Sequence, residues 1–106
     1  MNGFWTAKFN TAFGTGFGVA YFTGTEVFGG DSGYTYIGTY ETKGDTIVSK
    51  LRITPFGTGI PTVFGSSNQP FDLTITGTVQ GNQMTGRGSA SHAPGAGFQV
   101  TLTKLK

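Results

Sequence analysis

Apolar and polar residues alternate one by one through most of this chain, and glycine-centred turns separate the alternating segments. In 71–76 the apolar residues Phe71, Leu73 and Ile75 are each followed by Asp or Thr, and the same period recurs in 98–103. A two-residue period is that of a strand with one buried and one solvated face, whereas an amphipathic helix needs a period of 3.6. The pattern therefore predicts an all-β chain.

Eight segments of the chain either show this alternation or lie between two turn signals. We expect strands near residues 4–9, 16–23, 26–28, 34–42, 47–53, 71–76, 83–91 and 98–103. Hairpin signals join them at Thr23-Gly24-Thr25, Lys43-Gly44-Asp45 and Gly81-Asn82. Successive hairpins make an antiparallel meander, and eight short strands can close into a barrel without free edges. The predicted fold is an eight-stranded antiparallel up-and-down barrel, with residues 1–106 as one domain.

A glycine turn opens directly into an aromatic strand in the run from Gly29 to Tyr40. Gly29 and Gly30 allow close backbone approach, and the side chains of Asp31 and Ser32 can accept hydrogen bonds from the N–H groups of the turn. Tyr34, Tyr36 and Tyr40 then fall on one face of the strand. We interpret Asp31 as a residue that stabilises the turn rather than as a general base.

Charge and composition argue against several function classes. The chain has a formal net charge of +2, only 11% charged residues and no cysteine. Its seven Lys and Arg residues are scattered, so they make no stripe of the kind that binds nucleic acid. The N-terminal sequence lacks the features of a signal peptide, and no stretch approaches about 20 apolar residues. We therefore expect a cytoplasmic protein that contacts neither nucleic acid nor membrane.

No arrangement of side chains indicates catalysis or a cofactor. The five carboxylates are dispersed, which argues against a metal site. His92 is the only histidine and stands close to Pro94 and Gly95 in what we expect to be a solvated turn. We expect a protein that is not an enzyme and needs no cofactor.

The segment 55–70 contains three prolines and no period, so it is a long loop in this scheme. Ile60, Val63 and Phe64 make it apolar, which favours packing over one mouth of the barrel. Two alternatives follow for the interior. Either the aromatic side chains fill it, or it holds a small apolar ligand against inward residues such as Leu51, Ile53, Leu73 and Val100, with the loop at the mouth.

Segment 16–23 is apolar on both of its faces. Phe17, Val19 and Tyr21 alternate with Gly18, Ala20 and Phe22, and only one of these sets can point into the barrel. The other set needs cover, which predicts a homodimer formed through this wall.

Most of the chain resembles the GrlR family, negative regulators of type III secretion. The resemblance rests on Gly29-Gly30-Asp31 with the Tyr-rich strand after it, on Ile60-Pro61-Thr62-Val63-Phe64, and on the closing Phe98-Gln99-Val100-Thr101-Leu102. It implies a lipocalin-like barrel, a homodimer, and a regulator that binds a transcriptional activator protein instead of DNA. The family has an acidic run in the hairpin after the Tyr-rich strand. Here that hairpin reads Glu41-Thr42-Lys43-Gly44-Asp45, so no residue of the run is carried over.

The leading functional hypothesis is thus a non-enzymatic protein that binds or regulates a protein partner. The alternative is a lipocalin-like carrier or sensor of a small apolar ligand.

Overall fold

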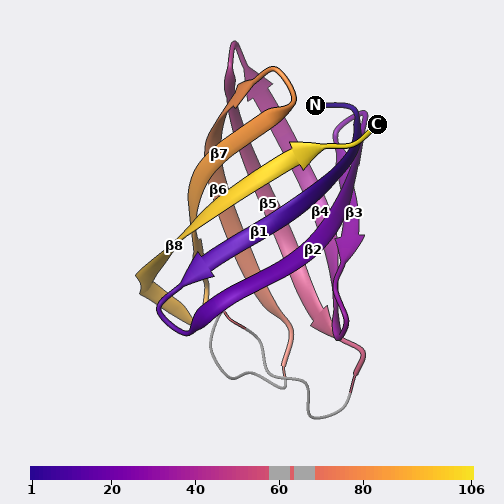
Figure 1. Ribbon diagram of the computed structural model, residues 1–106. Helices are drawn as coiled ribbons and strands as arrows, with labels where there is room; N and C mark the ends of the chain where they lie inside the picture. Colours follow the sequence, from indigo (N-terminus) through magenta and orange to yellow (C-terminus); the bar gives the residue numbers. More distant parts are fainter. Residues whose placement is uncertain (58–62, 64–68) are drawn as a thin grey trace.

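The chain forms eight strands and no helix within the residues that the computed structural model describes, which are 1–57, 63 and 69–106. The strands are β1 (Gly3–Thr11), β2 (Gly14–Thr23), β3 (Glu26–Gly30), β4 (Tyr34–Lys43), β5 (Thr46–Pro55), β6 (Phe71–Gln80), β7 (Gln83–Ala90) and β8 (Ala93–Lys104), shown in Figure 1. Accordingly, the described ranges hold no helix that is long and apolar enough to span a bilayer.

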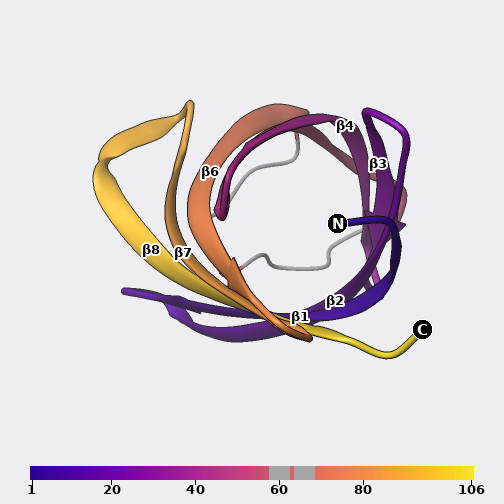
Figure 2. The same ribbon diagram turned by 90° about the horizontal axis from the view of Figure 1, so that it is seen from above.

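Each strand pairs antiparallel with the next one in sequence, and β8 pairs with β1 to close the barrel. Seen along its axis in Figure 2, the sheet forms a ring. The predicted eight-stranded antiparallel up-and-down barrel is confirmed, and all eight predicted segments lie in strands or reach only one residue beyond them.

The start of the last strand differs from the prediction. β8 begins at Ala93, so Pro94 and Gly95 belong to a strand and not to the turn that contains His92. Pairing of β8 with β1 starts only at Gln99, and the β7–β8 register shifts between Gly88 and Ala90. Proline lacks an N–H group and is tolerated in such a strand edge beside an irregularity.

Three of the hairpins share one turn geometry. Gly24, Gly44 and Gly81 each have φ of +61°, and the non-glycine residues that follow them have no positive φ. A glycine with positive φ at the first central position defines a type II′ turn, whose twist matches that of the strands it joins. The glycine turns of the sequence therefore set the register of these hairpins.

Inward-facing side chains fill the barrel. At one end Trp5 is 1% exposed, its indole N–H donates to the Met1 carbonyl at 2.9 Å, and its ring meets Phe22 edge-on. Tyr34, Tyr36 and Tyr40 lie on one face of β4, as the sequence predicts, and the structure shows that this face points inward. Ser49 is the one buried polar residue in the described ranges, and its hydroxyl donates to the Thr39 carbonyl at 3.1 Å.

Candidate functional site

The barrel interior has almost no free space. The residues expected to line a ligand cavity, Leu51, Ile53, Leu73 and Val100, are all buried and face inward. Of these four, only Leu51 borders the cavity found inside the described barrel, which measures about 20 Å³, room for a single water molecule. Of the two alternatives left open by the sequence, the filled barrel is the one observed.

Part of the long apolar segment packs on the barrel end. Val63 is half-buried against the core, and its carbonyl accepts a hydrogen bond from the Thr11 hydroxyl. It borders a cavity of about 10 Å³ together with Phe13, Ala96 and Phe98. Ile60 and Phe64, the other two residues expected at this mouth, lie outside the described residues.

The turn after β3 is organised by the carboxylate of Asp31. Its Oδ1 accepts hydrogen bonds from the N–H groups of Gly33 at 3.0 Å and Tyr34 at 2.9 Å. Its Oδ2 accepts one from the Tyr36 hydroxyl at 2.5 Å. Gly29 and Gly30 lie at the end of β3, and Ser32 is exposed. The contact with Tyr36 was not foreseen, although an inward-facing tyrosine hydroxyl needs a partner and could have suggested it.

Burial also changes the acid–base behaviour of two inward-facing tyrosines. Desolvation raises the pKa of Tyr36, and its hydrogen bond to Asp31 and the negative charge of that carboxylate raise it further. Burial likewise raises the pKa of Tyr40. Both phenols are therefore held in the protonated form by the packing of the barrel.

Replacing Asp31 by alanine is expected to lower the free energy of unfolding by about 2 kcal/mol, because two turn N–H groups and the buried Tyr36 hydroxyl lose their acceptor. Asp31→Asn keeps a side-chain oxygen for the turn and should cost less. The measurement is urea unfolding of these two variants, of Tyr36→Phe and of the double variant Asp31→Ala/Tyr36→Phe. It gives the coupling energy between the Asp31 and Tyr36 side chains. The double variant should lose less than the sum of its parts, and strict additivity would contradict the assignment.

The other titratable residues of the described ranges form no cluster that could bind a metal ion. His92 is exposed in the β7–β8 turn, with its ring edge-on to Phe71 at 4.6 Å. Among the described residues there is no group of three or more His, Cys, Asp or Glu placed to share a metal ion.

Large apolar side chains collect on the outside of one half of the barrel. Phe4, Tyr21, Phe28 and Ile37 are cross-strand neighbours in one row over β1 to β4. Val19 and Phe17 extend this row along β2, and all six side chains are exposed, Phe17 to 68%. We call these six residues the aromatic face. The sequence left open which apolar set of β2 faces outward. The structure places Phe17, Val19 and Tyr21 outside, and the register adds the other three.

The opposite half of the barrel has a polar exterior. The outward side chains of β6 to β8 are mostly threonine, together with Asp72, Arg87 and Gln99. None of the exposed large hydrophobic residues in the described ranges lies on these three strands. Six of the ten exposed large hydrophobic residues in the described ranges thus lie together on β1 to β4, whereas incidental surface hydrophobics are usually scattered.

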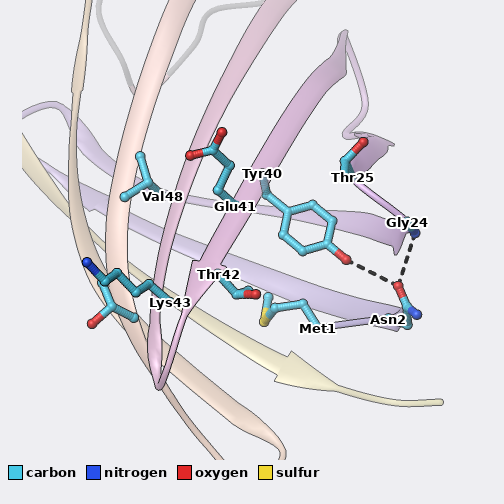
Figure 3. A pocket seen from close by; sticks show the side chains of 10 residues that line it. Met1, Asn2, Gly24, Thr25, Tyr40, Glu41, Thr42, Lys43 and Val48 are labelled. Carbon is cyan, nitrogen blue, oxygen red and sulfur yellow. Dashed lines mark hydrogen bonds between the residues drawn. The ribbon is translucent and has the colours of Figure 1, made fainter.

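A second feature is an open hollow of about 770 Å³ at the barrel end that carries the chain termini. We call it the end cup, and Figure 3 shows its lining. It is lined by Met1, Asn2, Gly24, Thr25, Tyr40, Glu41, Thr42, Lys43, Thr46 and Val48. The Asn2 side-chain oxygen accepts hydrogen bonds from the Tyr40 hydroxyl and the Gly24 N–H, both at 3.1 Å, and these fix one side of the cup.

The end cup was not foreseen from the sequence, which predicts a mouth at segment 55–70. β5 ends and β6 begins at the other end of the barrel, away from the chain termini (Figure 1). One sequence signal pointed to it. The expected strand 26–28 is much shorter than its neighbour 34–42, so the longer strand must extend past the shorter one.

No family model matches the chain, and the search of curated proteins gives no match either. The resemblance to the GrlR family therefore has no support from these comparisons.

Proposed function

We propose that this protein is a non-enzymatic binding protein that works through the outside of its barrel, with the aromatic face as the surface that binds protein. The observation that carries the proposal is the row of exposed apolar side chains across four neighbouring strands. The filled interior offers no comparable support for a carrier of a small ligand.

The size of the aromatic face supports a protein partner. Its six side chains leave about 500 Å² of apolar surface exposed if a ring contributes about 200 Å² when fully open. This lies near the upper end of the largest apolar patch on a typical monomer. It is also more than half of the roughly 800 Å² that each partner contributes to a standard interface.

A second copy of this chain is the first partner that we propose for this face. The six side chains carry no charge, so two copies can bring them together around a twofold axis without burying a charge. Lys8, the exposed cross-strand neighbour of Phe17, lies at the border of the face. A transcriptional activator as a further partner is the hypothesis that the family resemblance adds.

We expect the purified chain to sediment as a dimer at micromolar concentration, and Tyr21→Lys/Phe28→Lys to sediment as a folded monomer. Tyr21 and Phe28 are cross-strand neighbours at the centre of the row, where two buried lysines on each copy would lack partners. Sedimentation equilibrium measures the mass, and far-UV circular dichroism checks the fold.

The matched control is Thr78→Lys/Thr85→Lys, a cross-strand pair of exposed residues on the polar side of the barrel. It adds the same charge and should leave the dimer intact. A monomeric wild-type chain, or a dimer that persists in Tyr21→Lys/Phe28→Lys, would count against self-association through this face.

A further inference from the structure

The end cup is bordered by a length of strand that has a neighbour on only one side. Pairing of β3 with β4 ends at Glu26 opposite Thr39, followed by one hydrogen bond from the Tyr40 N–H to the Thr25 carbonyl. β4 nevertheless continues to Lys43 and pairs with β5 as far as Thr46. Residues 41–43 therefore have β5 on one side and the cup on the other.

The register shows which backbone groups face the cup. Lys43 and Thr46 flank the two-residue turn and form a hydrogen-bonded pair, so alternate residues of β4 aim their N–H and C=O groups at β5. The residues between them aim these groups the other way, as the bond from Tyr40 to Thr25 illustrates. Thr42 belongs to this second set. Its N–H and C=O groups point away from β5, and no strand of the described chain lies there to pair with them.

We propose that the end cup binds the main chain of an extended peptide from another protein, which pairs with Thr42 and lengthens the sheet at the edge of β4. One donor and one acceptor side by side match the backbone of a peptide strand, and strand addition to an open edge is an established mode of peptide recognition.

The side chains of the cup fit the same occupant. Glu41 and Lys43 place one charge of each sign at its border, which suits a neutral backbone better than a strongly charged ligand. Met1 and Val48 supply apolar contacts, and the Tyr40 ring is held in place by Asn2 (Figure 3). The volume of about 770 Å³ lies in the range of ordinary binding sites.

The test begins with a random heptapeptide library displayed on phage and selected against the full-length chain. Selected peptides are synthesised, and their binding is followed by amide NMR shifts and by titration calorimetry. We expect the Thr42 amide to shift on binding. Thr42→Pro should weaken binding at least tenfold, because it removes the N–H that faces the cup and none that faces β5. Thr42→Val keeps that N–H and should bind within twofold of wild type.

A second measurement does not depend on whether Thr42→Pro folds. Methylating the peptide nitrogens one at a time should abolish binding at one position, the residue whose N–H donates to the Thr42 carbonyl. The residues on either side of it should tolerate methylation, because their N–H groups point away from β4. Tyr21→Lys/Phe28→Lys should bind the peptides unchanged, which separates this site from the aromatic face. The proposal is overturned by a library that gives no binder, or by equal binding to Thr42→Pro. It is also overturned by a methylation scan in which no single position stands out, or by loss of binding in Tyr21→Lys/Phe28→Lys.

Discussion

Gly38→Ala is expected to cost about 3 kcal/mol or more of stability and to leave much of the chain unfolded, because it overfills a close strand contact. Gly38 lies opposite Leu51 in the β4–β5 pair. A Cβ atom at position 38 would lie 2.8 Å from the Leu51 Cα and would collide with the Lys50 carbonyl oxygen. Backbone atoms cannot rotate away as a side chain can, so β4 would have to separate from β5. Urea unfolding followed by circular dichroism measures the loss.

Gly95→Ala is the matched control for this variant. Gly95 also lies in a strand, but a Cβ atom there would meet no heavy atom within 4 Å. We expect a change within about 0.5 kcal/mol. Similar losses in the two variants would show that the effect belongs to strand glycines in general and not to the contact between β4 and β5.

The second large effect is a loss of stability at alkaline pH that depends on Tyr36. Its pKa is raised in the folded chain by burial and by Asp31. Above the ordinary tyrosine pKa of about 10, the unfolded chain therefore loses the phenol proton, whereas the folded chain keeps it. The stabilisation is fully present below pH 10 and falls as the pH rises. The expected slope from this residue is about 1.4 kcal/mol per pH unit, or nearly 3 kcal/mol by pH 12.

Urea unfolding of wild type and Tyr36→Phe at pH 9, 10, 11 and 12 tests this expectation. The Tyr36→Phe variant should be less stable than wild type at pH 9. Its free energy of unfolding should then fall less steeply with pH, because unfolding releases about one proton fewer. Tyr21→Phe is the control, measured at a protein concentration low enough to keep the chain monomeric, because the Tyr21 side chain of the single chain lies on the outer surface and is 48% exposed. Parallel slopes for wild type and Tyr36→Phe would contradict the role given to the buried hydroxyl.

The sequence predicts the strands wherever one face is buried and the other solvated, as in β5 and β6. It fails for the first residues of β8, because Pro94-Gly95-Ala96-Gly97 has no apolar period to read. The three hairpin turns are predictable since glycine at the first central position is a local requirement.

Features that depend on the register between strands could not be read in advance. Phe28 and Ile37 are distant from Phe4 in the sequence and join it only when three strand pairs are aligned. The bond between Asp31 and Tyr36 and the open edge at Thr42 depend in the same way on how far each strand extends. A local pattern shows which face of a strand is apolar, but not what lies beside it.

The pairing of β1 with β8 has a kinetic consequence. Every other pair joins strands that are neighbours in sequence and can form as a local hairpin, whereas Trp5 meets Lys104 across nearly the whole chain. Bringing such distant residues together costs chain entropy, so we expect ring closure to be a late and slow event in folding. Until it occurs, β1 and β8 both offer unpaired edges to other chains. The nearly complete, still open sheet is therefore the state in which this protein is most prone to aggregate during its synthesis.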